Sequence, residues 1–78
     1  MTITNDSLQA RIQSAFPDEQ VTIGGDGYHF EATIVSKQFV GKRAIARQQL
    51  VYAAVNDWLS SGELHALSMR CLTPDEAK

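Results

Sequence analysis

The two histidines, His29 and His65, and the single cysteine, Cys71, are the side chains of this chain best suited to bind a metal. A neutral imidazole can ligate a metal ion or carry a proton near neutral pH. Two imidazoles and one thiol are too few, and too far apart in the sequence, for a closed zinc site. A metal centre built on them would therefore need further ligands from a partner.

Sequence pattern leaves two interpretations open for each histidine. His29 follows the glycine-rich turn in "GGDGYHF" and lies on the polar side of an alternating segment. It is either a solvent-facing residue of a hairpin or a metal ligand or proton carrier. His65 follows a helix end at Gly62 and shares the apolar side of the next segment with Leu67. It is either a histidine at the rim of the core, hydrogen-bonded to backbone, or a ligand.

Catalytic chemistry has little support in the sequence. Cys71 lies on the apolar side of its segment with no basic residue on the same side, so we expect a buried small hydrophobic residue. A lone cysteine also excludes an intrachain disulfide. The sequence contains no GxSxG, HExxH or GxxxxGK motif. We therefore expect that the protein is not an enzyme.

Basic residues gather between Lys37 and Arg47, in a stretch without acidic residues, although the net charge of the whole chain is −2. A negative net charge argues against a general nucleic-acid binder. Lys42, Arg43 and Arg47 are the candidate partner-binding residues of this basic patch. They form either a solvated face or, at the start of a helix, an anion site.

Hydrophobic periodicity predicts the elements that position these side chains. A first helix over residues 4–16 is capped by Thr4, Asn5 or Asp6 and ended by Pro17. Two strands, over 20–23 and 28–35, flank the GGDG turn. The second of them alternates, with one face made by Tyr28, Phe30, Ala32 and Ile34.

The second half of the chain is predicted in the same way. Phe39 anchors a connector over 36–42, and a long helix runs over 42–60 until Gly62 stops it. A third strand over 64–72 is followed by a helix-start signature, with Thr73 as the cap and Pro74 in the first turn. The helix carries an apolar stripe of Val51, Tyr52, Val55, Trp58 and Leu59, and the strand an apolar face of Leu67, Met69 and Cys71.

The predicted fold class is α+β, in the order α-β-β-α-β, with a three-stranded mixed sheet covered by helices on one face. Seventy-eight residues allow a single domain over 1–78, with 1–3 and 74–78 as frayed tails. The longest apolar run is far below the roughly 20 residues that span a bilayer, and the start lacks a secretory layout. We expect a cytoplasmic monomer. The predicted core consists of Phe16, Phe30, Ile34, Phe39, Val51, Val55 and Leu67.

The stretches GDGYHFEATIVS, FVGK, RQQLVYAAV and ELHALSMRCLTPDE occur in the order and spacing of the BolA-like family, over nearly the whole chain. The histidine of the GDGYHF hairpin resembles the bacterial IbaG branch of that family. The resemblance implies a type II KH-like fold and a heterodimer with a monothiol glutaredoxin. It also implies that this pair shares a [2Fe–2S] cluster.

By the same resemblance, His65 corresponds to the family's histidine of the C-terminal half, and His29 to a second ligand from the hairpin loop. Thiolates from glutaredoxin and glutathione would complete the cluster, and the isolated protein would carry no cofactor. The KH-like fold also leaves a nucleic-acid-binding transcriptional regulator as an alternative. KH domains grip the backbone with a GxxG loop, whereas this chain has only "VGKR" there.

Overall fold

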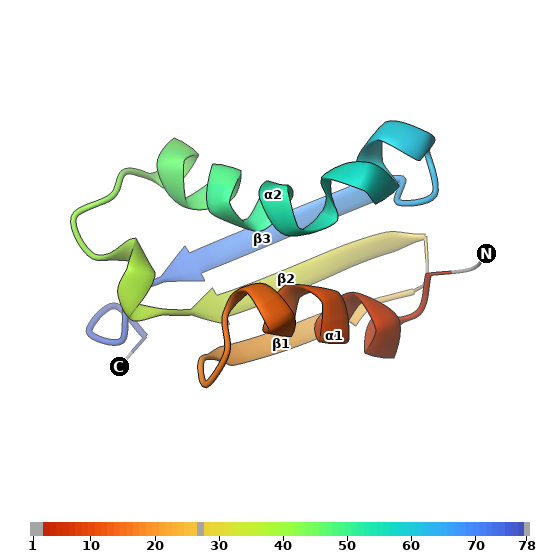
Figure 1. The fold of residues 1–78 in the computed structure, drawn as a ribbon. Coiled ribbons are helices and arrows are strands. Elements are labelled where there is room, and N and C mark those ends of the chain that lie inside the picture. Colours follow the sequence, from red (N-terminus) through yellow and green to blue (C-terminus); the bar gives the residue numbers. More distant parts are fainter. Residues whose placement is uncertain (1–2, 27, 78) are drawn as a thin grey trace.

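A computed structural model describes residues 3–26 and 28–77 as two helices, a short 3-10 helix and three strands (Figure 1). The predicted α+β class and the order of its elements are confirmed. Their bounds are α1 Asn5–Ala15, β1 Gln20–Gly25, β2 His29–Val35, η1 Lys37–Phe39, α2 Ala44–Ser61 and β3 Ala66–Leu72.

The sheet has the order β1-β2-β3. β1 and β2 form an antiparallel hairpin, in which Gln20 pairs with Val35 and Gly25 with Phe30. β3 lies parallel to β2, and His29 pairs with Ala66 at the start of this ladder. Both helices lie on one side of the sheet, and α2 provides the crossover that two parallel strands need (Figure 1). The mixed three-stranded sheet is as predicted.

The core lies between the sheet and the two helices. Six of the seven predicted core residues are buried: Phe16, Phe30, Ile34, Phe39, Val51 and Val55. Phe39 anchors η1 as expected, and its ring centroid lies 5.5 Å from that of Phe16. Leu67 is only partly buried, because β3 is an outer strand and one of its sides has no neighbouring strand. Tyr52 was predicted to share the apolar stripe of α2, but 38% of it is exposed.

Local capping explains where the helices begin and end. Thr4 is the cap of α1, because its Oγ1 accepts from the Ser7 N–H at 3.1 Å, while the Ser7 Oγ accepts from the Thr4 N–H at 2.9 Å. Helix α2 begins at Ala44, two residues later than predicted, and no side chain caps its start. It ends at Gly62, whose left-handed φ of 82° suits a residue without a Cβ.

The two ends of the described chain make specific contacts, which differs from the predicted frayed tails. Ile3 is buried in the core. After β3, Thr73 and Glu76 hydrogen-bond each other: the Thr73 N–H donates to Glu76 Oε1 at 2.8 Å, and the Glu76 N–H donates to Thr73 Oγ1 at 3.2 Å. Thr73 therefore caps a turn, as its sequence signature indicates. Residues 1, 2 and 78 of the predicted tails lie outside the described residues.

The hairpin contains a position that only glycine fits. Gly25 has a φ of 131°, and a Cβ there would overlap the backbone carbonyl oxygen of His29. We expect Gly25→Ala to lower the free energy of unfolding by about 1–3 kcal/mol, the usual range for a residue forced into such backbone geometry. Urea unfolding followed by circular dichroism measures this change.

Gly24→Ala is the matched control. A Cβ at Gly24 meets no atom within 4 Å, and alanine is favoured over glycine in a strand by about 0.5–1 kcal/mol. Gly24→Ala should therefore be neutral or slightly stabilising. Equal destabilisation by both substitutions would contradict the steric explanation.

Candidate functional site

The turn before β2 is held by the carboxylate of Asp26. Its Oδ1 accepts hydrogen bonds from the backbone N–H groups of Tyr28 and His29, both at 2.9 Å. These bonds hold the pKa of Asp26 below its usual value, because they stabilise the charged carboxylate, and the bond from His29 has the larger effect. The carboxylate and the close fit of Gly25 therefore fix the backbone from which Tyr28 and His29 project.

His65 is positioned by the end of α2. After Gly62 turns the chain back, Leu64 is buried, and its N–H donates to the Trp58 carbonyl oxygen at 3.1 Å. β3 begins one residue after His65. The imidazole is thus attached to backbone that is anchored on both sides, although His65 itself is exposed.

The structure brings the two histidines to the same end of the sheet. His29 pairs with Ala66, so His29 and His65 are one residue apart in register on adjacent strands. A strand spacing of about 4.8 Å and a rise of about 3.3 Å per residue place their Cα atoms roughly 6 Å apart. Both residues are exposed. His65 is not buried in the core rim, and His29 lies on the solvent face of β2, as its alternation indicates.

Tyr28 contacts both imidazoles. Its ring stacks on that of His65, with centroids 5.1 Å apart and an interplanar angle of 18°. It meets the ring of His29 edge-on, also at 5.1 Å, with an angle of 75°. The sequence pattern had assigned Tyr28 to the buried side of β2 with Phe30. Instead 59% of Tyr28 is exposed, because it lies in a bend just before the ladder begins.

The histidine pair is not a complete metal site. Within residues 3–26 and 28–77, no three side chains of His, Cys, Asp or Glu gather closely enough to hold a metal ion. Cys71 lies near the far end of β3, about 20 Å along the strand from His65. It is half-buried, and this burial raises the pKa of its thiol despite the opposing charge of Arg47. The prediction that no basic residue lies on the side of Cys71 did not account for Arg47, which reaches Cys71 from α2. A raised thiol pKa still disfavours a nucleophile.

Arg47 holds the C-terminal turn in place and is largely removed from solvent. Its Nε donates to the Lys42 carbonyl oxygen at 2.8 Å, and its Nη1 donates to that of Cys71 at 2.9 Å. The guanidinium also forms an ion pair with Glu76, with Nη1 2.7 Å from Oε1. Only 14% of the Arg47 side chain is exposed. Of the three predicted patch residues, Lys42 and Arg43 are exposed and Arg47 is engaged within the chain.

The basic patch and the histidines lie at opposite ends of the molecule. β2 and β3 begin beside the end of α2 and finish beside its start (Figure 1). Lys42 and Arg43 precede α2, so at least the length of β2, about 20 Å, separates them from His29. The sequence pattern gave no sign of this separation.

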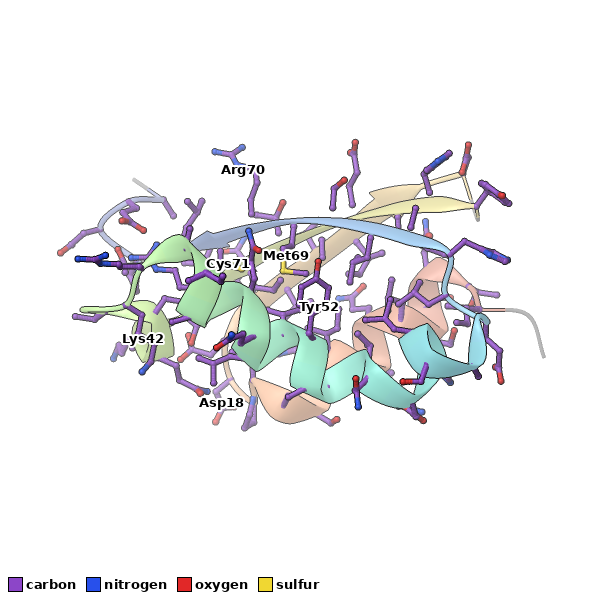
Figure 2. The ribbon with its side chains drawn as sticks, turned by 90° about the horizontal axis from the view of Figure 1, so that it is seen from above. Asp18, Lys42, Tyr52, Met69, Arg70 and Cys71 are labelled. Atoms are coloured by element: carbon purple, nitrogen blue, oxygen red, sulfur yellow. The ribbon has the colours of Figure 1, made fainter. Side chains whose placement is uncertain are left out.

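The face of the sheet without helices carries a hollow that the sequence did not predict. Its volume is about 300 Å³, and its polar lining comes from Glu31, Thr33, Ser68 and Arg70. Figure 2 shows Arg70 pointing away from the helices, whereas Met69 and Cys71 point toward α2. The alternation of β3 is therefore as expected, and its polar side faces solvent.

Comparison with known proteins shows the family of this chain. The family model described as "BolA-like protein" matches residues 1–76. The chain belongs to the BolA-like family. The acid stress protein IbaG of Escherichia coli K12 is 31% identical over 72 residues, which cover 92% of this chain and 86% of that protein. This relative agrees with the predicted IbaG branch.

Solved structures of the family share the fold. A BolA protein homologue from Coxiella burnetii superimposes with a TM-score of 0.83 at 36% identity and covers 96% of each chain. The BolA domain of SufE1 from Arabidopsis thaliana superimposes with a TM-score of 0.76 at 28% identity, over 92% of this chain and 93% of that one. Among the described residues, neither helix is long and apolar enough to cross a membrane.

The ion pair of Arg47 and Glu76 predicts an acid-sensitive contribution to stability. The hydrogen bond from Arg47 holds the pKa of Glu76 below its ordinary value of 4.5. A carboxylate whose pKa is lower in the folded than in the unfolded protein stabilises the fold at pH values above its unfolded-state pKa. This contribution is lost as the pH falls through the folded-state pKa. We expect Glu76→Gln to lower stability at neutral pH and to flatten its decline below the unfolded pKa.

Denaturant unfolding across this pH range measures the effect. Glu63→Gln is the control, because Glu63 is also an exposed carboxylate but lies beyond the opposite end of α2. It removes the same charge without touching the C-terminal turn. Identical pH profiles for the two variants would contradict a specific role for the Arg47–Glu76 pair.

Proposed function

We propose that this BolA-like protein is an iron–sulfur cluster adaptor that binds a monothiol glutaredoxin and shares a [2Fe–2S] cluster with it. His65 and His29 are its ligands to that cluster. The observation that carries the proposal is the placement of two exposed histidines on adjacent parallel strands, one residue apart in register. The role is that of a carrier and not of an enzyme.

The spacing of the histidines suits a shared metal centre. The Cα atoms of His29 and His65 are roughly 6 Å apart. Within a ladder, a one-residue offset in register turns two side chains to opposite faces of the sheet, but His65 lies just before its strand begins. Both imidazoles can therefore reach one centre only by turning toward each other at the end of the sheet.

The donor set also suits a cluster that is held jointly. In Rieske centres, two histidines ligate one iron of a [2Fe–2S] cluster and two cysteines ligate the other. This chain has two histidines at the site and no thiol near them, since Cys71 lies at the far end of β3. Thiolates from glutaredoxin and glutathione would supply the missing half. The kinship with the BolA domain of SufE1 supports an iron–sulfur setting.

We expect His65→Ala to abolish the visible spectrum of the cluster formed with glutaredoxin, and His29→Ala to weaken the cluster without preventing its formation. His65 follows the anchored Leu64, so it loses little conformational entropy on binding. His29 corresponds only to the second ligand that the family resemblance implies, from the hairpin loop, so its loss should be better tolerated. Absorbance and circular dichroism of the reconstituted pair measure the difference.

Glu63→Ala is the matched control, because Glu63 is exposed and lies two residues before His65. It should leave the cluster spectrum unchanged. Both histidine variants should keep the fold, since neither histidine belongs to the core. An unchanged cluster spectrum with folded His65→Ala would show that the ligand assignment is wrong.

Lys42 and Arg43 are proposed to assist partner docking through long-range attraction. They lie about 20 Å or more from the histidines, beyond a Debye length of about 10 Å at 0.1 M salt but within about 30 Å at 0.01 M. Reversal of both charges, Lys42→Glu with Arg43→Glu, should weaken glutaredoxin association at low salt and have little effect at physiological salt. Surface plasmon resonance across a salt series measures this.

The same double variant tests the nucleic-acid alternative. Phosphate-dominated binding weakens steeply as salt rises, and sequence-specific binding would survive physiological salt in an electrophoretic shift. A variant that binds glutaredoxin normally at every salt concentration but loses tight, specific DNA binding would favour a transcriptional regulator over the adaptor.

A further inference from the structure

Tyr28 occupies the space in which the two imidazoles would have to meet. Among the described residues, ring contacts join Tyr28 to His65 and Tyr28 to His29, but none joins the imidazoles to each other. Metal–nitrogen bonds of about 2.0–2.1 Å would bring the two ligating nitrogens within roughly 4 Å of each other. The tyrosine ring therefore lies where a common metal centre requires the imidazoles to approach.

The contacts of Tyr28 have no evident role in folding. The residue lies outside the hydrophobic core and is 59% exposed. Within the described part of the chain, its ring makes aromatic contacts with the two histidine rings, and its side chain makes no hydrogen bond. Its backbone, by contrast, is held by Asp26. The ring can therefore rotate into solvent while the turn that carries His29 stays in place.

We infer that Tyr28 is a removable spacer, which keeps the imidazoles of His29 and His65 apart in the free protein and turns outward when both bind one metal centre. This inference rests on the proposed function, since it concerns the same two ligands. The spacer lowers the affinity of the free chain for stray metal ions. The docked partner would offset the cost of displacing the ring.

The size of the effect follows from the energy of an aromatic contact. Ring pairs of this kind change an equilibrium constant by about two- to tenfold. Displacement of Tyr28 breaks two such contacts. Removal of the ring should therefore tighten metal binding by about tenfold, and removal of the hydroxyl alone should change it little.

Titration of the free protein with Zn²⁺ tests the inference without glutaredoxin or a cluster. By isothermal calorimetry, Tyr28→Ala should bind Zn²⁺ about tenfold more tightly than the wild type, while Tyr28→Phe, the matched control, should behave as the wild type. The gain should vanish in Tyr28→Ala combined with His29→Ala, because it requires both imidazoles. Tyr28→Leu is a second variant without a ring and should reproduce the gain if alanine disturbs the turn.

Proton NMR of the imidazoles gives an independent readout. In the wild type, the stacked ring of Tyr28 should shift the ring protons of His65 upfield, and saturation with Zn²⁺ should remove that shift. Equal Zn²⁺ affinities for wild type, Tyr28→Ala and Tyr28→Leu would overturn the inference, and so would persistence of the ring-current shift in the Zn²⁺-bound wild type. Failure of His65→Ala to affect the glutaredoxin cluster would overturn the proposed function instead, so the two failures are distinguishable.

Discussion

Parallel pairing of β2 with β3 is the constraint on which the placement of the candidate site depends. Parallel strands begin at the same edge of a sheet, so residues at their starts become neighbours even when they are far apart in sequence. The connection must then run back along the whole sheet, and α2 does so as an 18-residue helix. Gly62 ends that helix and Leu64 anchors the return. Together they determine where His65 lies relative to His29.

Helices cover only one face of this small sheet, and their side chains also tie down its outer strands. Gln9 of α1 donates from Nε2 to the Val21 carbonyl oxygen of β1 at 3.1 Å. Arg47 of α2 donates to the Cys71 carbonyl oxygen of β3 at 2.9 Å. Exposed strand edges invite pairing with other chains, and each of these bonds occupies an acceptor on an outer strand. This explains why Arg47, despite its place in a basic stretch, is unavailable to a partner.

Much of the fold was predictable because each element has its own local signal. Phe39 anchors η1 and Gly62 ends α2 as predicted, since burial of an isolated aromatic residue and the left-handed preference of glycine require little knowledge of distant residues. The class and order of the elements follow from the periodicities of their segments.

The candidate site was less predictable, because its details depend on contacts between distant segments. The alternation of side chains assigned Tyr28 to the core. Side chains alternate between faces only where strands pair, and the pairing of β2 with β3 starts at His29. Arg47 has two partners, Cys71 and Glu76, and both lie near the end of the chain. A run of basic residues carries no information about such distant partners. Convergence of the histidines depended on the register of β3 against β2, which neither strand encodes alone.

An incomplete ligand set has a physical advantage for the proposed role. A closed site with four ligands from one chain would hold its metal until several bonds broke together, whereas two imidazoles leave half of the bonds to the partner. Exposed histidines at the start of two paired strands combine access with a fixed backbone, because the core residues Phe30 and Leu64, each adjacent to a histidine, are 2% exposed. Changes at the histidines therefore do not alter the core. Under the proposed function, ligand exchange and partner choice would be adjusted at this end of the sheet while the fold stays unchanged.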